Sequence, residues 1–263
     1  MGLRGKVKGD SFEMEYYRFG SGERTLVIIP GVSTKPVVDN GPALERVFGR
    51  FTSGFTVYLF DRKLNLTEGY SVRDMADDTA DAMRRLGLKD AYIYAVSQGA
   101  MIAMTMAVEH SELVHVLYIS STRARQSAKS LEVFDKWMGI ADSGDYKALY
   151  RSFFEYVYSP AFLEKFAPAF ERLLNSACAD DLPRFKILAS AAAEFDIYSE
   201  LDKIGCPVFV FGADGDRIMG AEGPREIAEK LGCPCFIYSG YGHAVYDEAP
   251  DFFERMYNTL ISL

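Results

Sequence analysis

The sequence predicts an α/β protein with a mostly parallel central sheet flanked by helices, and with an inserted α-helical cap. Short, almost entirely apolar runs of the kind that form buried parallel strands alternate with helix-like segments. Such alternation is typical of parallel sheets with right-handed crossovers. The cap is indicated by one long stretch, residues 121–200, where the alternation stops and helical spacing rich in aromatic residues takes over.

Composition limits the classes of protein that need to be considered. The chain has 263 residues, of which 49% are apolar and 25% charged, which is enough for one large domain with an insertion. Its formal net charge of −8 argues against nucleic acid as a partner. We expect no signal peptide and no membrane partner, because no apolar run approaches the length of a membrane span and residues 1–10 are basic and glycine-rich.

The four cysteines are few and unevenly placed along the chain. Cys233-Pro234-Cys235 could be a metal or redox pair, but no other Cys or His residue clusters near it in sequence. We therefore expect reduced thiols in a cytoplasmic protein.

The first half of the chain predicts most of the sheet. Residues 6–19 alternate as a β-hairpin does, and residues 25–30 and 56–62 are apolar enough to be buried strands. Residues 71–86 begin with a capping serine, carry an apolar stripe and end before Gly87, which indicates an amphipathic helix. A further strand is predicted at residues 113–120.

Sheet patterning resumes after residue 200. Residues 201–212 lead into a strand, residues 223–231 form a short helix, residues 235–239 form the last strand, and an amphipathic helix runs from residue 250 to the end. We therefore divide the chain into a core, residues 1–121 and 201–263, and a helical cap, residues 122–200.

The most informative stretch is residues 91–110, where a buried strand becomes a buried helix with no room for a loop. Ser97 lies at the turn between them. Ala95 and Gly99, two residues before and after it, are small enough for the strand and helix backbones to approach closely. The serine hydroxyl should then project from the C-terminal edge of the sheet, beside the free N–H groups of a helix N-terminus.

This stretch resembles the nucleophile elbow of the α/β-hydrolase family, Gly-x-Ser-x-Gly, with Ala95 in place of the first glycine. Residues 201–212 are also similar to the segment that enters the family's seventh strand, and residues 122–200 occupy the position of the helical cap that the family inserts over its active site. The resemblance implies that Ser97 is a nucleophile. A minority of the cap aromatics should then face it and form an apolar pocket.

The resemblance also implies an oxyanion hole. The strand that ends at Pro30-Gly31-Val32 matches the family's His-Gly-x, with Pro30 in place of the histidine, so Val32 is the expected donor of one backbone N–H. Gln98, directly after the serine, is the expected second donor. Residues 63–67 lack the glycines that the family carries after the strand ending in Asp61-Arg62, which indicates a differently shaped loop.

A serine hydroxyl needs a base, and the chain has three histidines. His110 lies 13 residues along the helix from Ser97, about 20 Å away, and cannot reach it. His115 begins a strand and so lies at the edge opposite the ligand crevice of an α/β sheet. His243 follows the end of a strand, and its surroundings are similar to the family's Gly-His-x(4)-Glu-x-Pro loop. We therefore assign His243 as the base.

The acid that orients the histidine should lie between serine and histidine in chain order, as the resemblance implies. The family pattern Gly-x-x-Asp-Arg puts Gly215 at the acid position, so this loop carries one extra residue. Alignment on Asp-Arg-Ile selects Asp216 as the first choice, and alignment on Gly212 leaves Asp214 open as the second.

The predicted reaction is a two-step acyl transfer on a small-molecule ester, with no metal and no organic cofactor. A carboxylesterase is the first choice because an apolar cap suits an acyl substrate. A serine at the elbow argues against dehalogenases and epoxide hydrolases, which need aspartate there. A carbon–carbon bond hydrolase, lactonase, thioesterase or aminopeptidase would use the same triad, and a ligand-binding receptor without turnover is the alternative from another class.

Two of the alternative substrate classes would need further charged residues near the serine. An aminopeptidase would need cap carboxylates to receive the substrate ammonium group, and an acidic substrate would need cap arginines. The candidates for these two roles are Glu194 and Asp196, and Arg123, Arg125 and Arg151.

Overall fold

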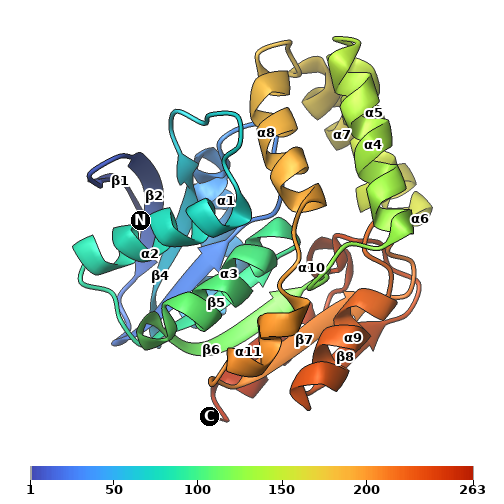
Figure 1. The fold of residues 1–263 in the computed structure, drawn as a ribbon. Helices are drawn as coiled ribbons and strands as arrows, with labels where there is room; N and C mark the ends of the chain where they lie inside the picture. Colours follow the sequence, from blue (N-terminus) through green and yellow to red (C-terminus); the bar gives the residue numbers. More distant parts are fainter. Residues whose placement is uncertain (1, 263) are drawn as a thin grey trace.

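A central sheet runs through the computed structural model, which describes residues 2–262 (Figure 1). The described residues form eight strands in the order β1-β2-β4-β3-β5-β6-β7-β8. Strand β2 pairs antiparallel with β1 and β4, whereas all pairs from β4-β3 to β7-β8 are parallel. The strands are β1 (Leu3–Lys8), β2 (Glu13–Gly20), β3 (Arg24–Ile29), β4 (Phe55–Lys63), β5 (Ala91–Val96), β6 (Val114–Ser120), β7 (Val208–Ala213) and β8 (Cys235–Tyr238).

Helices cover both faces of the sheet because its central strands are apolar on both sides. In β5, Ile93 and Ala95 face one cluster of buried side chains, while Tyr92, Tyr94 and Val96 face the other. The first cluster is covered by α2 (Val72–Arg85), α3 (Gln98–Glu109) and α9 (Glu222–Leu231). The second is covered by α11 (Phe252–Leu260) and by aromatic side chains that follow α1 (Gly41–Val47).

The stretch expected to be a cap contains helices and lies between β6 and β7. Figure 1 shows these helices standing away from the sheet, on the side of its C-terminal edge. Their base is closed by a bridge between Arg125 and Asp196 and by the bond from the N–H of Ile197 to the carbonyl of Ala124, 2.8 Å long. The helices are α4 (Ala128–Asp142), α5 (Tyr146–Val157), α6 (Pro160–Lys165), α7 (Ala167–Asn175) and α8 (Asp181–Ala193).

The fold class predicted from the sequence, a mostly parallel α/β sheet, is confirmed. The helix α2 has the predicted capping serine, since Ser71 accepts a bond from the N–H of Asp74, and Gly87 takes the left-handed φ of 69° that ends such a helix. The last helix was expected to run from Pro250 to the end of the chain. The structure begins this helix, α11, two residues later at Phe252 and ends it at Leu260, and a short helix that was not predicted, α10 (Val245–Glu248), precedes Pro250. Leu263 lies outside the described residues.

Within residues 2–262, no helix is both long enough and apolar enough to cross a membrane.

Candidate active site

Ser97 occupies a strained turn between β5 and α3. Strand β5 ends at Val96 and α3 begins at Gln98, so Ser97 alone makes the connection. Its φ of 54° and ψ of −121° are rarely adopted by a residue with a side chain. The turn is held from the neighbouring strand, because the N–H of Ser97 donates to the carbonyl of Ser120 over 2.9 Å and the hydroxyl of Thr122 donates to the carbonyl of Ser97 over 3.0 Å.

The structure shows why small residues flank this serine. A Cβ atom on Gly99 would lie 2.1 Å from the carbonyl oxygen of Ile29 and 2.6 Å from that of Pro30, which no side chain can satisfy. Ala95 is fully buried in the sheet. The close approach of α3 to the end of β3 therefore depends on glycine at position 99.

His243 and Asp216 meet on the same edge of the sheet. The Nδ1 atom of His243 lies 2.8 Å from Oδ2 of Asp216, and the two residues are 5% and 3% exposed. The second carboxylate oxygen of Asp216 accepts the backbone N–H groups of Ile218 and Met219, at 2.8 and 2.9 Å. Because an ionised carboxylate only accepts hydrogen bonds, Nδ1 is the donor in this pair and Nε2 is left with a free lone pair.

Asp214 lies in the same loop but is turned away from His243. Its carboxylate accepts the hydroxyl of Ser239 over 2.6 Å and the N–H of Gly240 over 2.7 Å, and these bonds hold its pKa below the usual value. Of the two acids left open by the sequence, the structure therefore brings Asp216 to the histidine and uses Asp214 to fix the turn after β8.

The other two histidines lie on the surface, away from Ser97. His110 contacts Asp77 and Arg84, and His115 contacts Asp90. All three histidines are among the described residues, and only His243 lines the pocket that also contains Ser97.

That pocket has a volume of about 400 Å³ and lies between the C-terminal edge of the sheet and the cap. The core residues that line it include Val32, Ser97, Ile218, His243 and Tyr246. The cap contributes mostly apolar and aromatic side chains, and the loop after β3 contributes polar ones. The cap residues are Phe134, Trp137, Tyr150, Phe153, Phe154, Val157, Tyr158, Leu173 and Ser176.

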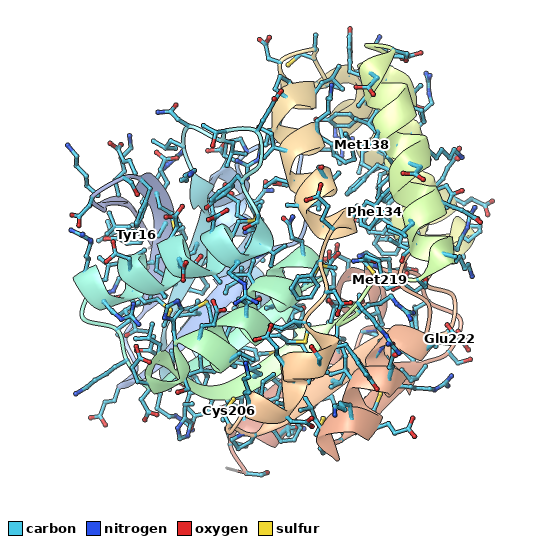
Figure 2. All side chains as sticks on the ribbon, in the orientation of Figure 1. Tyr16, Phe134, Met138, Cys206, Met219 and Glu222 are labelled. Carbon is cyan, nitrogen blue, oxygen red and sulfur yellow. The ribbon has the colours of Figure 1, made fainter. Side chains whose placement is uncertain are left out.

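Six of the fourteen aromatic residues at positions 122–200 line the pocket, more than the sequence led us to expect, and these residues also pack against other cap aromatics. Trp137 makes edge contacts with Phe134, Tyr156 and Phe185, at centroid distances of 5.9, 5.9 and 6.0 Å. Figure 2 shows Phe134 and Met138 of α4 on the side that faces α8. Of these two, Phe134 lines the pocket of Ser97.

The two expected oxyanion donors lie in the segments next to Ser97. Gln98 is the first residue of α3, so its N–H has no acceptor within the helix. Val32 lines the pocket, and Gly31 passes directly over the serine: a Cβ on Gly31 would lie 3.1 Å from Cβ and 3.7 Å from Oγ of Ser97. The loop after β3 is thus close enough to present a backbone N–H beside the hydroxyl.

This close approach gives a testable prediction. Replacing Gly31 with alanine should lower kcat for an ester about tenfold to a hundredfold, because the added methyl crowds Ser97, which its strained turn prevents from moving away. We expect the thermal unfolding midpoint to change by only a few degrees. Gly49→Ala is the matched control, since a Cβ there meets nothing within 4 Å. A folded G31A protein with unchanged kcat would show that the loop and the serine can separate freely.

Two further residues support the site and were missed in the sequence. Ser121 directly follows β6, has a φ of 52°, is fully buried, and donates its hydroxyl to the carbonyl of His243 over 2.6 Å. Thr122 holds the carbonyl of Ser97, as described above. Their position at the C-terminal end of a parallel strand was the available signal.

The charged residues considered for alternative substrates do not line this pocket. Arg123 and Arg125 both contact Glu226, Asp196 bonds the N–H of Tyr198, and Glu194 faces a separate cavity between α8 and the loop before α2. Arg151 is exposed on α5. Within the described residues, the pocket of Ser97 is therefore lined by none of them.

Among the described residues, neither the four cysteines nor a group with metal-ligand spacing lines the pocket of Ser97. All four cysteines are free thiols, and burial raises the pKa of Cys206 and of Cys233 to about 11. Among the described residues, the group with metal-ligand spacing is Asp77, Glu109 and His110, whose ligand atoms lie within 4.8 Å of one another on the surface near α2. His110 is already bonded to Asp77, and Glu109 is paired with Arg73.

Comparisons with known proteins agree with this architecture. A family model described as "Alpha/beta hydrolase family" matches residues 26–256. A protein of Caulobacter sp. (strain K31) named "Putative carbamate hydrolase RutD" is 25% identical over 212 residues, which are 76% of this chain and 78% of that protein.

Two solved structures are similar over nearly the whole chain. MGS-M2, an alpha/beta hydrolase enzyme from a Medee basin deep-sea metagenome library, superposes with a TM-score of 0.87 at 19% identity, covering 98% of each chain. The enol-lactonase from Burkholderia xenovorans LB400 superposes with a TM-score of 0.86 at 16% identity, covering 98% of this chain and 100% of that one. At these identities the likeness concerns the fold.

Proposed function

The chain belongs to the alpha/beta hydrolase family, and from this premise we propose that it is a serine hydrolase that cleaves small, largely apolar carboxylic esters. In this proposal Ser97 is the nucleophile, His243 the general base and acid, and Asp216 the group that orients the imidazole. The observation that carries it is the buried bond of 2.8 Å between His243 Nδ1 and Asp216 Oδ2, with His243 lining the same pocket as Ser97.

The reaction proceeds through an acyl-enzyme. Ser97 Oγ attacks the ester carbonyl carbon while its proton passes to Nε2 of His243, and the carbonyl electron pair moves onto the oxygen. The N–H groups of Val32 and Gln98 stabilise that oxyanion. When it collapses, the bond to the alcohol breaks and His243 gives its proton to the leaving oxygen. Water, deprotonated by His243, then releases the carboxylic acid and restores the serine.

The pocket supports an apolar ester as the substrate class. Its volume of about 400 Å³ falls within the range of small-molecule sites, and the cap side chains that line it are predominantly aromatic and aliphatic. The same groups could act on lactones, thioesters, amides or certain carbon–carbon bonds. An ester is the first choice because the cap lining is mostly apolar and the two charged residues that do line the pocket, Lys35 and Asp39, are paired with Asp181 and Arg4.

The proposal is tested by a fluorophosphonate probe together with p-nitrophenyl esters of increasing acyl length. We expect stoichiometric labelling on Ser97, located by peptide mass spectrometry, and turnover that is greatest for short to medium acyl groups because the pocket is small. Absence of both labelling and turnover would favour a ligand-binding receptor. Labelling without ester turnover would point to another acyl substrate for the same serine.

A further inference from the structure

Arg62 lies behind the two segments that carry the proposed oxyanion donors. It is the penultimate residue of β4 and only 2% exposed. Its Nη2 atom donates to the carbonyl oxygen of Pro30 over 2.6 Å and to the side-chain oxygen of Gln98 over 3.2 Å. One guanidinium nitrogen thus joins the end of β3 to the start of α3.

Both partners of Arg62 are adjacent to a proposed donor. The carbonyl of Pro30 belongs to the peptide that leads into Gly31 and Val32, and Gln98 contributes its own N–H. The amide of Gln98 is fixed on its other side as well, since its Nε2 atom donates to the carbonyl of Leu188 in α8 over 2.5 Å. Arg62 therefore constrains the distance and the relative orientation of two segments, Pro30 to Val32 and the start of α3, between which an oxyanion would form.

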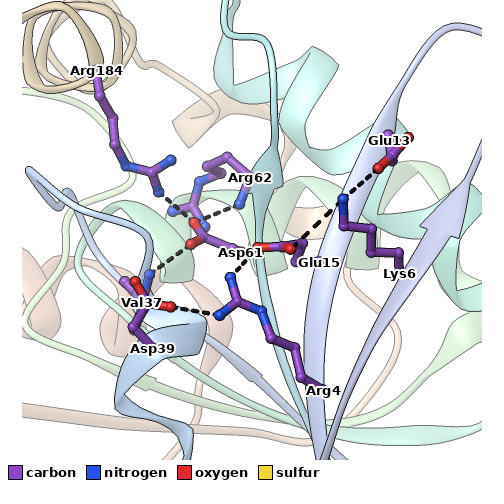
Figure 3. A network of polar contacts seen from close by, with 9 residues as sticks. All are labelled: Arg4, Lys6, Glu13, Glu15, Val37, Asp39, Asp61, Arg62 and Arg184. Carbon is purple, nitrogen blue, oxygen red and sulfur yellow. Dashed lines mark hydrogen bonds and ion pairs between the residues drawn. The ribbon is translucent and has the colours of Figure 1, made fainter. Parts of the chain in front are cut away.

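The neighbouring residue anchors the same loop at a second point. Asp61 accepts the N–H of Val37 over 2.6 Å and pairs with Arg184 of α8, whose Nη2 atom also donates to the hydroxyl of Ser33 over 3.2 Å. Figure 3 shows the side chain of Arg184 reaching Asp61, with Arg62 beside them; the backbone N–H of Arg62 also donates to Asp61. The loop from Pro30 to Val37 is consequently held at its start by Arg62 and farther along by Asp61 and Arg184.

Burial disfavours the charge of Arg62, and the neighbouring carboxylate of Asp61 offsets part of that cost. The Nε atom of Arg62 is buried without a hydrogen-bond partner, and burial lowers the pKa of the guanidinium to about 10. The group remains protonated at neutral pH. A buried cation that is incompletely paired costs stability, and its position behind two anion-binding N–H groups is where such a charge would favour a developing oxyanion.

We propose that Arg62 is a positioning residue for the oxyanion hole. It fixes the relative position of the backbone donors of Val32 and Gln98 and adds a positive charge behind them. This inference rests on the proposed function, because it concerns the same site.

The test compares two inhibitors on the Arg62→Met variant. An alkyl trifluoromethyl ketone accepts the Ser97 oxygen at its carbonyl carbon, the serine proton passes to His243, and the adduct carries an oxyanion. The matching methyl ketone binds mainly without forming that adduct. We expect R62M to lower kcat about tenfold to a hundredfold and to weaken the trifluoromethyl ketone in parallel, while KM and the methyl ketone inhibition constant change by less than about threefold.

Arg24→Met is the matched control. Arg24 begins β3 at the other end of that strand from Pro30, and its guanidinium lies 4.3 Å from the ring centroid of Phe55. Its replacement should affect thermal stability without changing the ratio of the two inhibition constants.

The outcomes are distinct. If R62M lowers only the unfolding midpoint and leaves kcat and the inhibitor ratio unchanged, Arg62 has a purely structural role and this inference is wrong. If the unaltered protein neither turns over esters nor binds the trifluoromethyl ketone, the proposed function itself fails.

Should R62M not fold, Gln98→Met removes one acceptor of Arg62 and keeps the backbone N–H. We expect it to weaken the trifluoromethyl ketone selectively, and an unchanged ratio would overturn the inference.

Discussion

Replacing Ser97 with alanine is expected to lower kcat for p-nitrophenyl esters by about a millionfold, because no other group supplies the attacking oxygen, and losses of this size follow removal of a nucleophilic serine. Fluorophosphonate labelling should disappear as well. The substitution removes one oxygen from a residue that is only 9% exposed, and it leaves the bonds from Ser97 N to Ser120 and from Thr122 to Ser97 O in place. The protein should therefore remain folded, which a thermal melt checks directly.

A second serine substitution separates this effect from general damage. Ser143 directly follows α4 on the surface of the cap, where its hydroxyl donates to the carbonyl of Ile140. Ser143→Ala should keep the full rate. If a purified S97A protein retains more than about a thousandth of the rate of the unaltered protein, the assignment of Ser97 as nucleophile is wrong.

The sheet could be predicted from the sequence because its signals are local. Central strands such as β3 and β5 are apolar throughout, and the change from strand to helix at Ser97 takes place within a single residue, so neighbours in sequence were sufficient to recognise both. The capping box at Ser71 is equally local. The last helix was expected from Pro250 and begins two residues later, at Phe252, whereas the short helix α10 before it was not predicted.

The contacts that support the site depend on long-range packing and left no local signal. Arg62 reaches Pro30 and Gln98 from a different strand, and Arg184 reaches Ser33 from the cap, across 151 residues of sequence. A charged residue near the end of an apolar strand is unusual, but its partners could not be inferred without the strand order. Choosing between Asp214 and Asp216 likewise required the shape of the loop after β7, because the extra residue made alignment ambiguous.

A substitution in the loop after β7 gives the second large predicted effect on kcat. Asp216→Asn should lower kcat about ten-thousandfold, because an amide facing Nδ1 of His243 can donate a hydrogen bond and then stabilises the tautomer that carries its proton on Nε2. That tautomer cannot take the proton of Ser97. The measurement is kcat at a pH near neutrality, with a fluorophosphonate labelling rate as an independent readout of serine reactivity.

Asp214→Asn is the paired control, two residues away and identical in chemistry. Its carboxylate bonds Ser239 and Gly240, so an asparagine oxygen can keep part of that pattern, and kcat should stay within about threefold. The comparison is decisive because the two acids differ in what they hold: Asp216 fixes a buried imidazole, whereas Asp214 fixes an exposed turn. Equal losses in the two variants would mean that the loop acts as one structural unit, and a larger loss in D214N would reverse the assignment of the acid.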